Sequence, residues 1–425
     1  MRGLVRNPAI PGTLLRRLVE EQLTEVGFFL SHRQHWSDEQ FDALVDHPDP
    51  RVRIRLAEAP QLRPEQRVRL VEDPDPQVLS ALAVGPTKTD LRLTTLEPLM
   101  PEWAYRRLIE RSASLRSALV DNRWVPRELR EELSPKADPT SVPVEDPPLD
   151  RAEAEARACS DSLAERVRAA IDPRLPADLV ATLAVDPSPR VRLIVSMRRE
   201  LSEEERAAID YQVAPTDRIA PAYWARTTLD PQEQRRCVYS AHIGLRRSVA
   251  YNPALSPELV AVLAIDDDFA VRLLLCENHA EVPSETVLNA YLEARTMSRG
   301  QLLHHPAFNR VGLARLAESP DPGARYLVVL DPEATPALLE RLSRDPHPAV
   351  RTRVAADARL SRDRVLQLFD DPLATGGAAA SPHLPVPMME RILADAAGLS
   401  DEEIEGTPAV YLGNWPADKL PDDVR

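Results

Sequence analysis

The chain has 425 residues, of which 43% are hydrophobic and 28% charged, and its formal net charge is −14. This acidic balance opposes a general affinity for nucleic acids or anionic membranes, because both depend on an excess of lysine and arginine. The 41 prolines are too regularly spaced for a disordered chain, and we interpret them as punctuation between helices.

The sequence also favours a cytoplasmic protein. Its three cysteines, Cys159, Cys237 and Cys276, are far apart and lack metal-ligand spacing, which is typical of a reducing compartment. The N-terminal residues MRGLVRNPAIPG lack the apolar core of a signal peptide, and no apolar run reaches the roughly 18 residues that a membrane span needs. We therefore expect no membrane association.

Residues 1–84 predict three helical units. Asn7-Pro8 opens the first unit, and Ser37 with Gln40 has the spacing of a capping box at the start of a helix. After Val84 the pattern slips by about eleven residues, which indicates an inserted loop or a lengthened unit within residues 85–101. The helical pattern resumes at Trp103.

Residues 134–150, SPKADPTSVPVEDPPLD, contain five prolines and little apolar periodicity, which predicts a linker. We therefore expect an N-terminal repeat array at 1–133, a proline-rich linker at 134–150 and a C-terminal array at 151–375. Residues 376–425 are expected to form an irregular terminal repeat followed by a polar cap. A hinge between the two arrays is the simplest interpretation of this division.

Residues 331–361 represent the repeated unit best. Thr335-Pro336 predicts a helix start, Asp345-Pro346 ends that helix, and a shorter helix begins at Pro348. The apolar position of Val350 recurs at intervals of 24 to 28 residues through most of the chain. One such unit cannot bury its apolar faces without neighbours. The pattern predicts an all-α fold, an α-solenoid of about 13–15 units that each pair an α-helix with a short α- or 3₁₀-helix.

The recurrent pattern at 252–272 and 331–355, and in part at 172–195, resembles the leucine-rich repeat variant family, an architectural relative of HEAT and armadillo repeats. The resemblance implies a right-handed superhelix. The first described member of that family also looks like an iron–sulfur protein with cysteines ahead of its repeats. No cysteine precedes Cys159 here, and a cluster needs about four thiolates, so we expect no such centre.

An arginine follows the apolar position in most units. Stacking would align these arginines along one surface, where they could bind the carboxylates of an acidic partner or phosphates. Alternatively, each arginine pairs with an acidic residue of a turn, as in HEAT-like repeats. The series contains Arg53, Arg116, Arg168, Arg192, Arg246, Arg272, Arg299, Arg325 and Arg351, of which the six from Arg192 onward are our candidate partner-binding residues.

Trp224 lies in an irregular unit, where a departure from the repeat pattern can mark a binding residue or can fill a gap in packing. The histidines lack converging ligands, and His305 and His347 stand at turn positions. Acidic runs such as 203–205 and 266–268 coincide with helix starts and stops. We find no phosphate-binding loop and no nucleophile motif, and we assign no catalytic, cofactor or metal residue.

These features favour a non-enzymatic repeat scaffold that binds another macromolecule, most readily a protein with an acidic segment. Two alternatives stay open. One is a HEAT-like nucleic-acid binder or DNA glycosylase, which requires the arginines to lie unpaired in a local groove. The other is an enzyme with its site in the irregular segments at 85–101 or 134–150.

Overall fold

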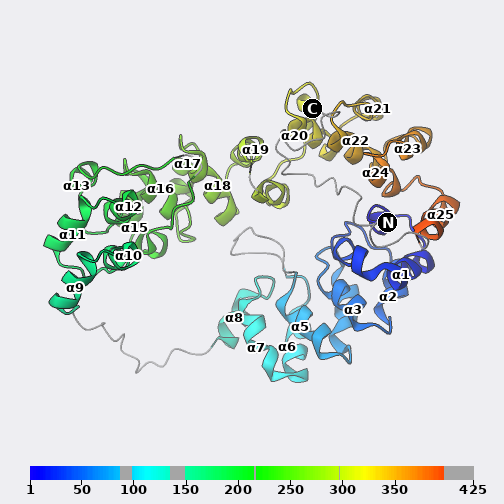
Figure 1. The fold of residues 1–425 in the computed structure, drawn as a ribbon. Helices are drawn as coiled ribbons and strands as arrows, with labels where there is room; N and C mark the ends of the chain where they lie inside the picture. Colours follow the sequence, from blue (N-terminus) through cyan, green and yellow to red (C-terminus); the bar gives the residue numbers. More distant parts are fainter. Residues whose placement is uncertain (87–97, 135–148, 215–216, 296, 397–425) are drawn as a thin grey trace.

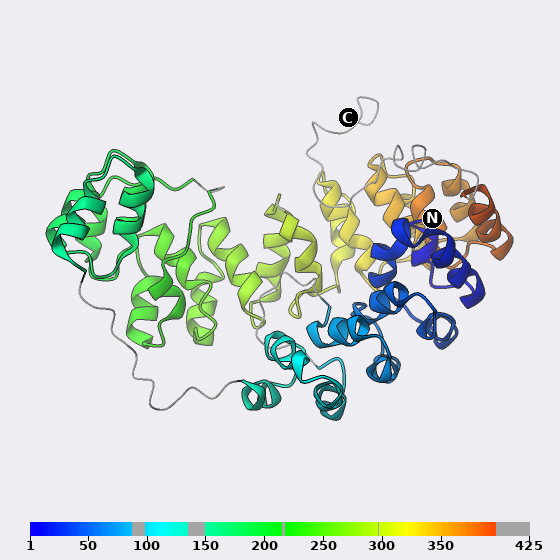
Figure 2. The same ribbon diagram turned by 60° about the horizontal axis from the view of Figure 1, so that its bottom comes forward.

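The structure is a computed structural model of the chain, and it describes residues 1–86, 98–134, 149–214, 217–295 and 297–396. These residues form helices joined by short turns, with no β-strand among them. The predicted all-α fold is therefore confirmed. Figures 1 and 2 show the helices arranged along a curved arc that has two arms. No helix within these ranges is long and apolar enough to cross a membrane.

Residues 1–133 form the first arm. Its α1 is two helices joined at Gln22, whose φ of −139° and ψ of 28° are not helical. The elements of this arm are η1 (Leu4–Arg6), α1 (Gly12–Ser31), α2 (Asp38–Val45), α3 (Pro50–Ala57), α4 (Pro64–Val68), η2 (Arg69–Glu72), α5 (Pro76–Val84), α6 (Glu102–Arg111), η3 (Ala113–Leu115), α7 (Arg116–Asp121) and α8 (Arg127–Leu133).

Residues 151–396 form the second arm, which is longer. Its elements are α9 (Arg151–Ala158), α10 (Leu163–Ile171), α11 (Ala177–Ala184), α12 (Pro189–Ser196), α13 (Glu203–Ala207), α14 (Tyr223–Thr227), α15 (Pro231–Val238), α16 (Ile243–Val249), α17 (Pro257–Leu263), α18 (Phe269–Asn278), α19 (Ser284–Glu293), η4 (Met297–His304), η5 (Leu313–Leu316), α20 (Pro322–Leu327), η6 (Val328–Leu330), α21 (Pro336–Leu342), α22 (Pro348–Ala355), α23 (Arg362–Phe369), α24 (Thr375–Ala379) and α25 (Val386–Ala396).

The pair α21 and α22 shows how the sequence builds one unit. Thr335 caps α21 by accepting a hydrogen bond from the Leu338 N–H, and Pro336 occupies the first helical position. His347 caps α22 in the same way through Nδ1, followed by Pro348. The apolar residues of both helices, Leu339, Leu342, Val350 and Val354, are buried. Local caps thus set the helix ends, and the apolar spacing sets the buried faces.

The second helices of successive units pack against one another. This contact joins α3 with α5, α10 with α12, α20 with α22, and α22 with α24. Buried side chains form hydrophobic clusters that each extend over several neighbouring units. This stacking is compatible with the predicted α-solenoid, in which each unit completes the core of its neighbour. The right-handed twist of the superhelix stays a prediction.

The first unit of the chain and the last described units meet within this stack. The buried Asn7 side chain donates hydrogen bonds from Nδ2 to the carbonyl oxygens of Ala379 at 3.0 Å and Ser381 at 2.5 Å. Arg198 makes the same contact inside the second arm, from Nη1 to the carbonyl oxygens of Ala170 and Asp172, both at 2.9 Å. The junction between the first and the last described units therefore uses hydrogen bonds from a side chain to two carbonyl oxygens, as the contact at Arg198 does between consecutive units.

Apolar packing continues across this junction. Leu384, Met389 and Leu393, the last two of them on α25, belong to the same buried cluster as Leu4 and Val5 of η1. In space the second arm thus runs directly into the first, and Figure 1 shows α24 and α25 beside η1 and α1. The predicted boundary at 375 falls at the start of α24, and the packing of α22 on α24 continues across it. Most of the predicted linker and the predicted polar cap, residues 135–148 and 397–425, lie outside the described residues.

Candidate functional site

The arginine series forms a ladder between units. In the most regular cases the guanidinium Nε donates to an aspartate twenty residues further on, in the next turn. These bonds join Arg53 to Asp73 (2.7 Å), Arg246 to Asp266 (2.7 Å), Arg325 to Asp345 (2.6 Å) and Arg351 to Asp371 (2.8 Å). In the same guanidinium groups, Nη1 donates to the carbonyl oxygen six residues earlier. Each arginine therefore ties its own turn to the next one.

The aspartate of each pair also stabilises the turn in which it lies, by accepting a backbone hydrogen bond. Asp345 accepts the His347 N–H at 2.8 Å in addition to the two bonds from Arg325. Burial alone would raise the pKa of Asp345, but the hydrogen bonds from Arg325 and the His347 N–H outweigh it, and the pKa lies below its ordinary value. The carboxylate is thus held ionised inside the array.

The remaining candidate arginines make related contacts with other acceptors. Arg192 bonds to the carbonyl oxygens of Asp186 and Asp210, Arg272 pairs with Glu293 at 2.5 Å, and Arg299 pairs with Asp321 at 3.2 Å. All six candidate side chains, from Arg192 to Arg351, are between 12% and 20% exposed. The structure accordingly gives this series an architectural role and leaves little of it accessible to a partner.

In one unit, the arginine that the sequence assigns to the series is the wrong one. Arg168 is 69% exposed on its side chain and pairs with Glu165 on the same helix. The ladder position of that unit belongs to Arg166, whose Nε donates to Asp186 at 2.7 Å and whose Nη1 donates to the Ser160 carbonyl at 2.8 Å. Arg168 follows Val167, which is only half-buried, so the spacing of apolar residues alone assigns the wrong arginine in this unit.

Trp224 has a packing role. Its indole Nε1 donates to the Met197 carbonyl oxygen at 2.9 Å, and its ring packs against the hydrophobic cluster of the second arm. A half-buried tryptophan with a satisfied N–H fills space between units. This contact matches the second of the two interpretations that the sequence left open.

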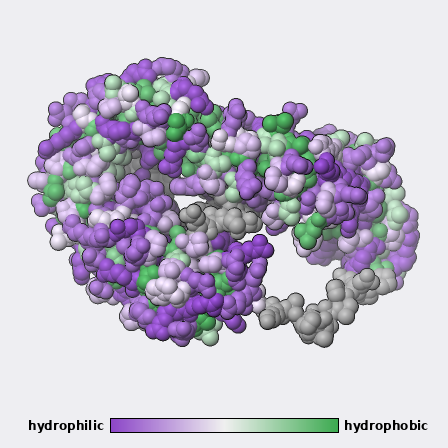
Figure 3. Space-filling view, turned by 180° about the vertical axis from the view of Figure 1, so that it is seen from behind, coloured by the Kyte–Doolittle hydropathy of each residue, from purple (hydrophilic) through white to green (hydrophobic). Residues whose placement is uncertain are grey.

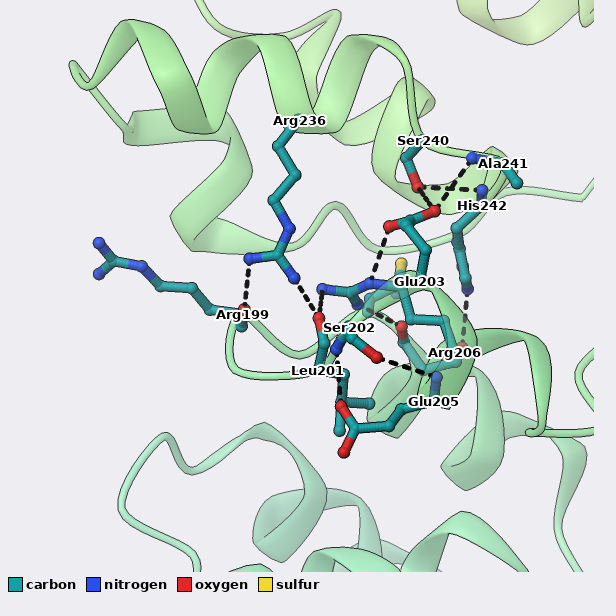
Figure 4. Close-up of polar contacts among 12 residues, drawn as sticks. Arg199, Leu201, Ser202, Glu203, Glu205, Arg206, Arg236, Ser240, Ala241 and His242 are labelled. Atoms are coloured by element: carbon teal, nitrogen blue, oxygen red, sulfur yellow. Dashed lines mark hydrogen bonds and ion pairs between the residues drawn. The ribbon is translucent and has the colours of Figure 1, made fainter.

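A cluster of polar contacts joins α13 to the start of α16 (Figure 4). At its centre Arg206 is 1% exposed and donates to the carbonyl oxygens of Ser196 (2.5 Å) and Leu201 (3.0 Å). Glu203 forms an ion pair with Arg206 at 3.3 Å and accepts hydrogen bonds from Ser240 Oγ at 2.8 Å and from the Ala241 N–H at 3.1 Å. Burial is the main cause that lowers the pKa of Arg206. The cluster joins two units through charged groups.

His242, the helix cap of α16, makes a contact that superficially resembles a catalytic serine–histidine pair. Its Nε2 lies 2.8 Å from Ser196 Oγ. However, Nδ1 accepts the Gly244 N–H at 3.0 Å, so the proton of the neutral ring is on Nε2 and is donated to the serine. Ser196 Oγ in turn donates to the Leu193 carbonyl, and both side chains are almost fully buried. The histidine is therefore not positioned as a base toward this serine.

Exposed apolar residues recur at one position of the repeat. In each unit, this position comes directly before the residue whose carbonyl oxygen accepts the hydrogen bond from Nη1 of the ladder arginine. It is occupied by Cys159, Val185, Tyr239 and Ile265, which we call the apolar row. Val185 is 79% exposed, Tyr239 62% and Ile265 82%, and Cys159 is also exposed.

Other units carry charge at the same position. The equivalent residues of the units around Arg53, Arg325 and Arg351 are Asp46, Glu318 and Arg344, and all three are exposed. A single exposed apolar side chain is ordinary, but several in the same register are not. Figure 3 shows that, on the face drawn there, apolar patches are small and are separated by hydrophilic surface. The apolar row is therefore the clearest departure from the charged surface of the array.

Within the described ranges, no group of three or more histidine, cysteine, aspartate or glutamate side chains is arranged to hold a metal ion. Comparisons with protein-family models, with curated proteins and with solved structures found no match to this chain. The candidate surface accordingly rests on the geometry of the chain itself.

Proposed function

We propose that this chain is a non-enzymatic repeat scaffold, resembling the leucine-rich repeat variant family, that binds another protein along its solenoid surface. The observation that carries the proposal is the apolar row. Burying a fully exposed valine or isoleucine against a partner contributes roughly 1.5–3 kcal/mol, so several such residues at one edge can support a stable contact. Repeat arrays present extended surfaces of this kind without needing a catalytic pocket.

The chemistry of the row favours a protein over a nucleic acid. Nucleic-acid binding depends on accessible cations that neutralise phosphates. The arginines that the nucleic-acid alternative requires are occupied by aspartates and carbonyl groups of the array. The enzyme alternative places its site at 85–101 or 134–150, and most of both segments, residues 87–97 and 135–148, lies outside the described residues. We also propose a cytoplasmic location, supported by the three cysteines, which are free thiols in the structure.

Affinity capture from native lysate tests this proposal. The bait is the wild-type chain or the double variant V185D/I265D, which places two carboxylates in the apolar row. The matched control, D46K/R344D, changes charges at the same repeat position in units outside the row. We expect wild type and control to retain the same protein partner and V185D/I265D to lose it.

Two results would contradict the proposal. If all three baits retain the same proteins, the apolar row is not the binding surface. If the wild-type bait retains only nucleic acid, and nuclease treatment leaves no bound protein, the chain is not a protein-binding scaffold. Circular dichroism of each bait verifies that the substitutions leave the helical fold intact.

A further inference from the structure

The apolar row follows an edge of the second arm along which side-chain contacts link each turn to the next. Arg166 donates from Nη1 to the Ser160 carbonyl oxygen at 2.8 Å and from Nε to the Asp186 carboxylate at 2.7 Å. Cys159 and Val185 directly precede these two acceptors in the chain. The helices that end at these two residues, α9 and α11, also pack against each other. Cys159 and Val185 are therefore neighbours on this edge.

The other two residues of the row are neighbours for the same reason. Arg246 donates to the Ser240 carbonyl oxygen at 3.0 Å and to the Asp266 carboxylate at 2.7 Å. Tyr239 and Ile265 directly precede these two acceptors. The helices that lead into the two turns, α15 and α17, pack against each other. One guanidinium group thus holds the turn of Tyr239 beside the turn of Ile265.

The irregular unit between these two pairs continues the edge. Arg192 donates to the carbonyl oxygens of Asp186 at 2.7 Å and Asp210 at 2.5 Å. The residue after Asp210 is Tyr211, whose ring stacks on His242 with 4.0 Å between the ring centroids. His242 is the last residue of the turn that follows α15. These contacts connect all four turns of the row into one edge.

The turns that carry the row are acidic. Together they contain five aspartates and neither lysine nor arginine. Three of the aspartates, Asp186, Asp266 and Asp268, accept hydrogen bonds from arginines of the array. The other two, Asp161 and Asp267, are exposed. The four turns are CSDS (159–162), VDPS (185–188), YSAH (239–242) and IDDD (265–268).

The ends of three helices add to this negative character. Cys159, Val185 and Tyr239 are the C-cap residues of α9, α11 and α15. The C-terminus of a helix carries a partial negative charge of up to about half an elementary charge. The edge therefore combines exposed apolar side chains with negative charge. Such a surface attracts a cationic partner, and it repels nucleic acid and a second copy of this chain, whose net charge is −14.

The spacing of the units along this edge fits an α-helix. Packed helices lie roughly 8–10 Å apart, and neighbouring residues of the row are separated by about the same distance. An α-helix rises about 1.5 Å per residue and returns to the same face after about seven residues, or roughly 10.5 Å. A helix laid along the edge would therefore place one apolar residue against each unit.

We propose that the apolar row binds a basic amphipathic helix of a partner protein. This proposal rests on the proposed scaffold function and deepens it by naming the class of partner. The apolar stripe of that helix covers Val185, Tyr239 and Ile265, and its lysines or arginines pair with Asp161 and Asp267. The proposal replaces the acidic partner expected from sequence, because the arginines on which that expectation depended are occupied by acceptors of the array itself.

Fluorescence anisotropy tests the proposal on the full chain with a fluorescein-labelled peptide of three LKKLAKK repeats, whose leucines share one helical face. The variant V185N/I265N removes apolar surface from the row. Its control, Y223N/L229N, replaces two residues outside the row that are 77% and 78% exposed. We expect V185N/I265N to lose at least tenfold in affinity and the control to match wild type within twofold.

A second pair of variants tests the charge. D161N/D267N removes the two exposed carboxylates beside the row, whereas D363N/E390Q removes two exposed carboxylates elsewhere. We expect D161N/D267N to bind the peptide at least threefold more weakly and D363N/E390Q to match wild type. Added salt should weaken wild-type binding, because the contact includes exposed charges.

Several results would overturn the proposal. Equal binding by wild type and V185N/I265N means that the row does not contact the helix. Tighter binding of three LEELAEE repeats assigns the row to an acidic helix, and tighter binding of seven PKL repeats assigns it to an extended segment. Dimerisation of wild type that V185N/I265N abolishes, measured by sedimentation velocity, makes a second copy the occupant.

These results are separable from the test of the scaffold function. If no peptide binds while V185D/I265D still loses the captured protein, the row is a protein-binding surface and only the class of partner is wrong. If V185D/I265D retains that protein, the scaffold proposal fails at the row whatever the peptides do.

Discussion

Replacing Asp266 with alanine should destabilise the second arm by about 3 kcal/mol. Asp266 accepts two hydrogen bonds from Arg246, at 2.7 and 3.4 Å, and one from the Asp268 N–H at 2.8 Å. Buried hydrogen bonds to charged groups contribute roughly 1.5–3 kcal/mol each. Arg246 is 20% exposed and keeps its two carbonyl acceptors in the D266A variant, so the loss should be smaller than the sum of the three bonds.

The neighbouring residue supplies a matched control. Asp267 lies in the same turn and is exposed, so D267A should change stability by less than about 0.5 kcal/mol. Urea denaturation gives the overall change, and hydrogen exchange read by mass spectrometry locates it, because repeat arrays open unit by unit. Faster exchange confined to residues 240–275 in D266A is the expected result. Equal stability of D266A and D267A would refute the structural role given to the arginine ladder.

Three further outcomes follow from burial and close packing. Burial is the main cause that lowers the pKa of His242 to about 4. The free energy of unfolding should therefore be constant above about pH 6.5 and fall by about 3 kcal/mol as the pH drops to 4. Urea titrations at each pH measure this profile, and the H242Q variant should flatten it. Iodoacetamide at pH 8 should alkylate Cys159 alone in the folded chain, because burial raises the pKa of the other two thiols to about 12. Mass spectrometry counts the adducts, and in urea all three cysteines should react. A Cβ on Gly3 would lie 2.0 Å from the Gly376 carbonyl oxygen, so G3A should lower the thermal midpoint by several degrees, whereas G300A, with open space around it, should not.

Most of the fold could be predicted from the sequence, because interactions within one repeat unit determine its helices. Proline at the first helical position, capping residues and apolar spacing act within one unit, and at Thr335 and His347 the structure shows the predicted helix starts. The junction between the first and the last described units was not predicted. It depends on contacts between Asn7 and residues 379–381, and contacts between segments so far apart leave no periodic pattern.

The candidate surfaces were less accessible. The arginine series was visible, but its pairing with aspartates in the next turn depends on how units stack. Val185, Tyr239 and Ile265 occupy the same repeat position, and a comparison of that position across units would have found them from the sequence. Sequence patterns therefore predict which residues are regular, whereas the stacking of units decides which partners those residues find.

The contact between the first unit and residues 379–393 has a consequence for biosynthesis. The N-terminal units emerge first from the ribosome, yet Leu384, Met389 and Leu393, which belong to the same hydrophobic cluster, are made only after the second arm up to α24. Until then Leu4 and Val5 lack their packing partners, and Asn7 lacks its carbonyl acceptors. Completion of this cluster therefore depends on synthesis of residues 384–393, and a chain that stops before them would leave part of the apolar face of the first unit exposed, which is the kind of surface that promotes aggregation.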